Sequence, residues 1–126
     1  MAIAHPRKQL AEYLAEHCPK TWLIVPEQRT FDAVGKTTLV VKQHRVTRTS
    51  AAPIGIRTVE FTLTLVSRFK NIAAAEDDLD ARLDELLQVL DAAGGIKWTT
   101  ADKVAVTETY LGYDVEVEIN TTKENL

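Results

Sequence analysis

The chain has 126 residues, of which 45% are hydrophobic and 26% charged, and its formal net charge is −3. These values predict one domain spanning residues 1–126, with a core that needs no disulfide or metal. No apolar run approaches the ~20 residues of a membrane-spanning helix. We therefore expect no membrane partner and a location in the cytoplasm where the chain is made. The acidic net charge argues against a general nucleic-acid binder.

The first predicted element is a helix that begins near Pro6, a residue that the first helical turn tolerates. Pro19 ends this helix. Trp22 to Val25 then form a short apolar run closed by Pro26, which predicts an edge strand or an extended packing segment. The N-terminal helix is predicted from the helical spacing of Leu10, Tyr13, Leu14 and His17.

Two strands joined by a long loop are predicted next. Residues 38–46 have an apolar start and a basic end. Residues 56–68 alternate apolar side chains with threonine and glutamate, which indicates a strand with one buried face. Between them, residues 47–55 (TRTSAAPIG) contain Pro and Gly and little to bury, so we expect a long flexible hairpin loop. We expect this loop to be poorly ordered in an isolated subunit and to become ordered on assembly.

A long acidic helix is predicted over residues 72–93. Asn71 is the expected N-cap, and Gly94-Gly95 ends the helix. We expect the acidic residues to favour the start of the helix, where its dipole stabilises negative charge. The apolar stripe that should lie on a sheet consists of Leu79, Leu83, Leu86, Leu87 and Leu90.

The C-terminal part predicts a β-hairpin with strands at 103–110 and 113–121, joined by a tight turn at Leu111-Gly112. The predicted fold class is α+β: a mostly antiparallel sheet, with the long amphipathic helix packed on one face and an N-terminal helix. The predicted core residues are Val59, Phe61, Leu63, Leu65, Leu79, Leu83, Leu86, Leu90, Val115 and Val117.

Charge is divided unevenly along the chain. No Asp or Glu occurs between Ala33 and Val59, whereas the long helix carries seven acidic residues and the single cation Arg82. Both segments could be solvated surfaces. Alternatively, the basic segment of each subunit contacts the acidic helix of its neighbour in a head-to-tail ring. A third possibility is that the acidic stripe lines a channel and keeps DNA from adhering to the wall. The candidate interface residues are Lys42, Arg45, Arg48, Arg57, Asp77, Asp80 and Asp84.

Motifs that would indicate catalysis or a cofactor are incomplete. The GKTT sequence at 35–38 resembles the end of a phosphate-binding loop, but Thr30 stands where that motif requires a glycine. Residues 78–80 resemble the start of a calcium loop, yet Leu83 replaces its glycine. The three histidines are scattered, and the lone Cys18 is expected to be a small buried hydrophobe. We therefore predict a protein that is not an enzyme, with no catalytic, cofactor-binding or metal-binding residues.

The order and spacing of these elements resemble the tail terminator, or tail completion, proteins of long-tailed non-contractile bacteriophages, the group that includes the lambda-type terminators. The resemblance covers nearly the whole chain. It rests on the N-terminal helix, the short strand TWLIVP at 21–26, and a strand–long loop–strand unit closing on LVS at 65–67. It continues with the helix that contains AEDDLD at 75–80 and the leucine stripe, the IKWTTA segment at 96–101, and the hairpin sequence YLGYD at 110–114.

The resemblance implies a structural virion protein without catalytic residues. Such subunits form a hexameric ring on the head-proximal end of the tail tube, stop its polymerisation and provide the surface for head-tail joining. The implied partners are further copies of the chain, the tail tube protein and a head-tail connector or neck protein, with DNA only passing through the lumen. A neck, head-closure or tail-tube-like subunit of the same particle, and a small intracellular ligand-binding protein or enzyme subunit, remain alternatives.

Overall fold

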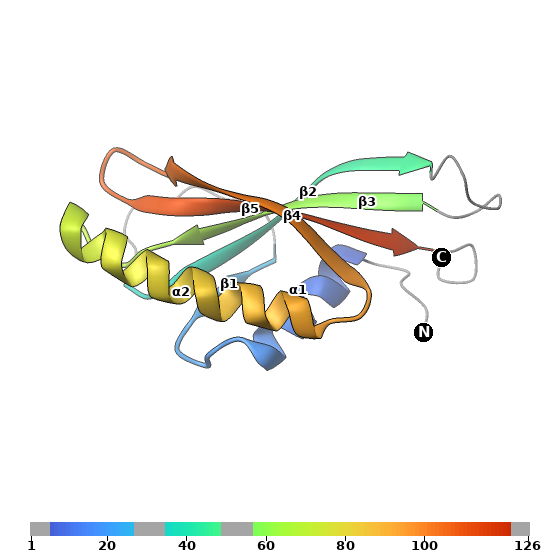
Figure 1. Cartoon of the computed structure of the whole chain (residues 1–126), viewed down its shortest axis with the longest axis horizontal. Coiled ribbons are helices and arrows are strands. Elements are labelled where there is room, and N and C mark those ends of the chain that lie inside the picture. Colours follow the sequence, from blue (N-terminus) through green and yellow to red (C-terminus); the bar gives the residue numbers. More distant parts are fainter. Residues whose placement is uncertain (1–5, 27–34, 49–56, 122–126) are drawn as a thin grey trace.

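The computed structural model describes residues 6–26, 35–48 and 57–121 (Figure 1). Its five strands form one sheet in the order β1-β2-β3-β5-β4, in which only the β1–β2 pair is parallel. This arrangement confirms the predicted α+β class with a mostly antiparallel sheet. In chain order the elements are α1 (Pro6–His17), β1 (Leu23–Val25), β2 (Thr38–Arg48), β3 (Arg57–Val66), α2 (Ile72–Ala92), β4 (Ile96–Ala105) and β5 (Leu111–Thr121).

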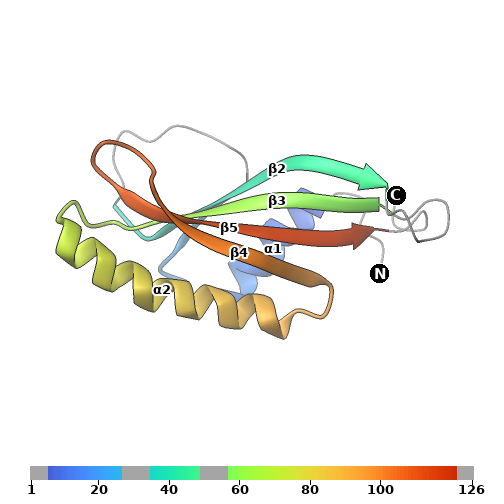
Figure 2. The same ribbon diagram turned by 45° about the horizontal axis from the view of Figure 1, so that its top comes forward.

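Both helices lie on the same face of the sheet, as Figures 1 and 2 show from two directions. Helix α1 contacts β1 and β2, whereas α2 contacts β3, β4 and β5. The Tyr13 hydroxyl of α1 donates a hydrogen bond to the Val89 carbonyl of α2 at 3.0 Å, which joins the two helices. The fold therefore has two layers, and the sheet face away from the helices is called the open sheet face below.

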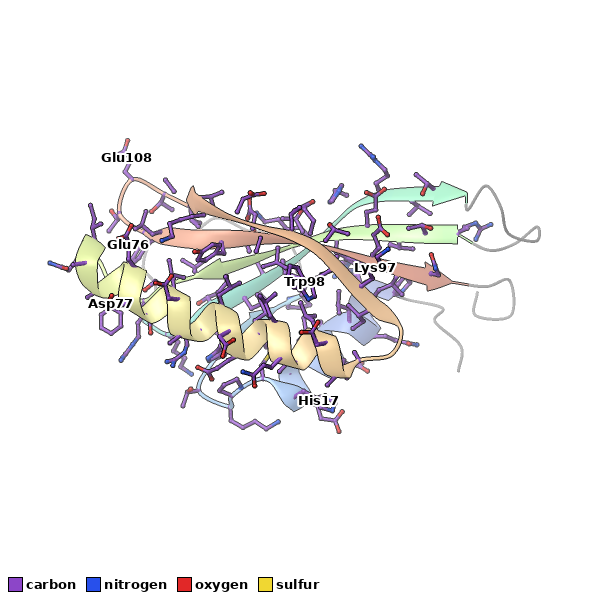
Figure 3. The ribbon with its side chains drawn as sticks, viewed as in Figure 1. His17, Glu76, Asp77, Lys97, Trp98 and Glu108 are labelled. Atoms are coloured by element: carbon purple, nitrogen blue, oxygen red, sulfur yellow. The ribbon has the colours of Figure 1, made fainter. Side chains whose placement is uncertain are left out.

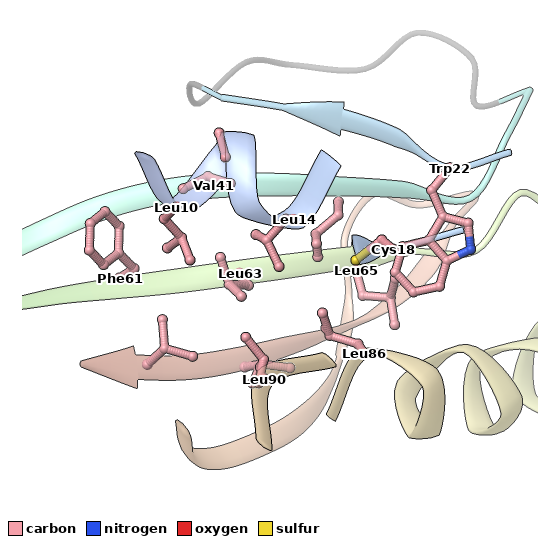
Figure 4. Packing of buried hydrophobic residues seen from close by; sticks show 14 of the residues in the cluster. Leu10, Leu14, Cys18, Trp22, Val41, Phe61, Leu63, Leu65, Leu86 and Leu90 are labelled. Carbon is pink, nitrogen blue, oxygen red and sulfur yellow. The ribbon is translucent and has the colours of Figure 1, made fainter. Parts of the chain in front are cut away.

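The main core lies between the two layers (Figure 4), and a smaller buried cluster that contains Val66 and Tyr110 lies on the other face of the sheet. Phe61, Leu63 and Leu65 alternate along β3 and are fully buried against leucines of both helices. Leu79, Leu86 and Leu90 form the buried stripe of α2, as predicted, whereas Leu83 is only partly buried at its margin. Period-two alternation in the strands and helical spacing in α2 thus account for the same core.

Helix α2 begins as predicted, since the Asn71 side chain accepts a hydrogen bond from the Ala74 amide at 3.1 Å. The expectation that acidic residues lie at its start is wrong for the first turn, Ile72 to Ala75, which contains none. The carboxylates begin at Glu76, one turn further on, where the effect of the helix dipole has declined. The helix ends at Ala92, just before the predicted glycine pair.

The predicted loop at 47–55 begins too early. Thr47 and Arg48 continue β2, because they pair with Thr58 and Arg57 of β3. Residues 49–55 lie outside the described residues, and the prediction about their order stays a prediction. At its other end β3 stops at Val66, two residues before the predicted end.

The predicted turn at Leu111-Gly112 is wrong. Both residues belong to β5, and the connection with β4 is made by residues 106–110. The predicted strand at 103–110 is correspondingly misplaced, because β4 starts at Ile96 and ends at Ala105. Gly112 is needed because its neighbours pack too closely for a side chain, and not because it forms a turn. A Cβ atom there would lie 2.7 Å from Val106 Cγ2 and closer still to the Leu65 carbonyl oxygen.

Candidate functional site

The outer face of α2 carries an exposed acidic surface, which consists of Asp77, Asp80 and Asp84. Figure 3 labels Asp77 near the start of this helix. Within the described residues, no cation forms an ion pair with any of the three. Asp84 accepts a hydrogen bond from the Gln88 amide at 2.7 Å, one turn along the helix. Asp80 also attracts the ammonium group of Lys103 over a longer distance than an ion pair. The three exposed carboxylates can still accept contacts from a partner outside the subunit.

The other acidic residues of α2 have partners within the fold. Glu76 forms a 3.7 Å ion pair with Lys103 of β4. Asp91 accepts a 2.8 Å hydrogen bond from the Trp98 indole nitrogen. These contacts tie α2 to β4, so the helix divides its carboxylates between internal contacts and the acidic surface.

Two rows of paired side chains cross the open sheet face, because residues opposite each other on antiparallel strands share a face. One row is Lys42, Thr62 and Glu116, and the next contains Arg45 and Glu60. The register shifts between Gln43 and Arg45. This β-bulge places Lys42 and Arg45 on the same face although they are three residues apart.

Threonines hold the carboxylates of the open sheet face. Thr62 Oγ1 lies 2.8 and 3.0 Å from the two oxygens of Glu116, and Thr64 Oγ1 donates to Asp114 at 2.7 Å. His44 Nδ1 lies 3.2 Å from Thr62 Oγ1, and its Nε2 lies 3.8 Å from Glu116. The result is a hydrogen-bonded polar surface of mixed charge.

The basic residues named from the sequence do not share one surface. Lys42 and Arg45 lie on the open sheet face, and Arg45 forms a 3.7 Å ion pair with Glu60 while its side chain stays 63% exposed. Arg57 is two residues from the buried Val59, so its position lies on the helix-covered face of β3, at the end of the sheet. The backbone of Arg48 pairs with that of Arg57.

The remaining motif residues are placed as follows. Cys18 is buried, and burial raises the pKa of its thiol to about 11. The thiol therefore stays protonated and unreactive near neutral pH. His17 stacks on Tyr13 with ring centroids 4.1 Å apart. Residues 35–38 lead into β2 instead of connecting a strand to a helix. No group of three or more His, Cys, Asp or Glu side chains within the described ranges could hold a metal ion.

A cationic cavity lies beside the start of β2 and was not anticipated from the sequence. Its volume is about 540 Å³, and its charged lining residues are Lys20, Lys36, Arg68 and Arg82. These residues come from four separate segments of the chain, so no local sequence pattern marks the cavity. Only the fold brings them together.

No protein-family model matches the chain, and a search of curated proteins finds no match either. Among the described residues, neither helix combines the length and the apolar character that a membrane span requires.

Proposed function

We propose that this chain is a structural subunit of a long-tailed bacteriophage virion, which forms a ring on the tail tube, terminates tube polymerisation and provides the head-tail joining surface. The proposal rests on the resemblance to tail terminators in the order of the elements. Helix, short strand, strand pair, long helix and hairpin follow one another along the described chain in that order. The proposed partners are copies of the chain, the tail tube protein and a neck or connector protein, with DNA only in the lumen.

The placement of charge supports a head-to-tail contact between copies. The acidic surface lies on the outside of the helix layer, whereas Lys42 and Arg45 lie on the outside of the sheet layer. A heterologous interface needs two different surfaces of one subunit, because each copy presents one surface to the copy on either side. In this arrangement Asp80 and Asp84 of one subunit meet Lys42 and Arg45 of the next, and the contact contributes specificity and association rate.

Termination of tail tubes is the direct test of the function. Purified chain is added to polymerising tail tube protein, and tube lengths are measured by electron microscopy. We expect shorter tubes of uniform length, each with a ring at one end. If the chain neither binds tube ends nor changes tube length, the proposed function is wrong.

Charge reversal tests the contact within the ring. The Lys42→Glu/Arg45→Glu variant should remain folded and form fewer rings, and adding Asp80→Lys/Asp84→Lys should partly restore them. The matched control is Lys8→Glu/Lys70→Glu, which changes the net charge equally at exposed positions on α1 and before α2, outside the candidate interface residues. Ring formation by the first variant at low salt, at the level of the control, would show that these two surfaces do not meet.

A further inference from the structure

The cationic cavity near the start of β2 brings four cationic residues together in a chain whose net charge is −3. Among the described residues, its lining contains Thr21, Trp22, Gly35 and Thr37 besides the four cations. A volume of about 540 Å³ is within the range of small-molecule sites. The cavity therefore combines the size of a ligand site with a lining whose described charged residues are all cations.

Three of its cations form no ion pair with a described carboxylate. Among the described residues, no ion pair involves Lys20, Lys36 or Arg68. Lys20 Nζ donates to the Ala15 and Glu16 carbonyls at 3.0 Å each, which leaves one of its three N–H bonds for another acceptor. These neutral contacts fix the ammonium group without cancelling its charge.

The two arginines are held in place by neighbouring groups. Arg68 stacks its guanidinium over the Phe69 ring at 4.6 Å. Arg82 forms ion pairs with Glu85 and, at 3.6 Å, with Asp78, which also accepts a 3.1 Å hydrogen bond from Ser67. A guanidinium has five N–H donors, so these contacts orient the group and leave donors available. Positioned donors bind an anion with little loss of side-chain entropy.

Uncharged donors complete the lining. Thr21 and Thr37 add hydroxyl groups, and Trp22 lies with its indole nitrogen on the side of the ring away from Cys18 (Figure 4). Charge-assisted hydrogen bonds from lysine and arginine, together with hydroxyl donors, are the contacts that oxyanions receive in proteins.

We propose that this cavity binds a small oxyanion with two or more negative charges, of the phosphate or polycarboxylate class. Lys36 and Arg68 contact the anion directly, Lys20 contributes its third N–H, and Arg82 supplies a fixed donor at the wall. The proposal is independent of ring formation, because none of these residues belongs to the acidic surface or to the cationic pair on the open sheet face.

The test is an amide NMR titration of the full chain with sodium pyrophosphate, with citrate, and with sodium chloride at matched ionic strength. We expect saturable shifts confined to residues 20–22, 35–37 and 68 with at least one of the two polyvalent anions. The anion that binds more tightly assigns the ligand to the phosphate or the carboxylate class. Shifts that sodium chloride reproduces, or that spread over the whole surface, would overturn the proposal.

Two variants with equal charge changes make the test specific. Lys36→Gln/Arg68→Gln should weaken binding by about tenfold or more, because two charge-assisted hydrogen bonds are lost. Lys97→Gln/Arg57→Gln should change binding less than about twofold, because Arg57 begins the ten-residue β3 and the cavity lies beyond the far end of that strand, roughly 30 Å away. Equal weakening in both variants would exclude a small-anion site in this cavity.

Discussion

Gly112 lies in β5 opposite Val66 of β3 and Val104 of β4. A methyl group at this position would collide with the Leu65 carbonyl oxygen and with the Val106 side chain. The Leu65 carbonyl belongs to a central strand and cannot move without disturbing the ladder. Gly112 is therefore required for packing between strands.

Replacement of Gly112 by alanine should lower the free energy of unfolding by about 1–3 kcal/mol, the usual cost of overpacking. Gly94→Ala is the matched control, because a Cβ atom at Gly94 meets nothing within 4 Å. Its effect should remain within about 0.5 kcal/mol. Urea unfolding followed by circular dichroism measures both. A Gly112→Ala variant as stable as the Gly94→Ala variant would show that β5 can shift away from Leu65.

At the residue scale, roles set by local chemistry were predictable and roles set by tertiary contact were not. Asn71 is an N-cap residue type placed directly before a helical pattern, and its cap was found from the sequence. Gly112 was interpreted as a turn residue, because sequence cannot distinguish a glycine that needs conformational freedom from one that needs space. The shared face of Lys42 and Arg45 depends on a β-bulge that leaves no clear sequence signal.

Helix α2 contacts three strands of the sheet, and its leucines differ in burial although they are identical in type. Leu86 is fully buried, whereas Leu83 lies at the margin of the stripe and is partly exposed. The helical period of 3.6 residues places both on the same side of the helix, but only the middle of the stripe faces the sheet directly.

Leu86→Ala should lower the free energy of unfolding by about 2–5 kcal/mol, because it removes apolar contacts and leaves a cavity. Leu83→Ala should cost clearly less, since its side chain already contacts solvent in part. Chemical denaturation of the two variants under identical conditions gives the comparison. Equal losses would mean that another surface buries Leu83 in solution.

The misplaced hairpin shows where element boundaries escape sequence patterns. Strand β4 lies at the edge of the sheet and has no fully buried residue, so its alternation is weak. A register shift between Trp98 and Thr100 interrupts it further. The central strand β3 has strong alternation, because it has a strand on each side and the helix layer covers one of its faces. The sequence therefore located both of its ends within two residues.

On the scale of the whole molecule, the strand order places β3 between β2 and β5, while β1 and β4 form the two edges. The α+β class was predictable because each element carried its own periodicity. The cationic cavity was not, because its residues are brought together by the packing of segments far apart in the sequence.

Hydrogen-exchange rates should follow the position of each strand in the sheet, with the central strand slower than the edges. Amides of β3 bond to strands on both sides and should exchange at least about 100-fold more slowly than the outward-facing amides of β4. Exchange followed by NMR in the isolated subunit measures the difference. If the outward amides of β4 are protected as strongly as those of β3, the edge is covered, and a second copy of the chain is then the first occupant to test.

The two tryptophans are placed at opposite edges of the same sheet. Trp22 is buried directly before β1, and Trp98 lies in β4 with its indole N–H bonded to Asp91 of α2. Four interstrand spacings separate the two edge strands by roughly 20 Å. Intrinsic fluorescence therefore has two independent sources in this chain: Trp22 emission reports on the docking of α1 and β1, and Trp98 emission reports on the contact between β4 and α2.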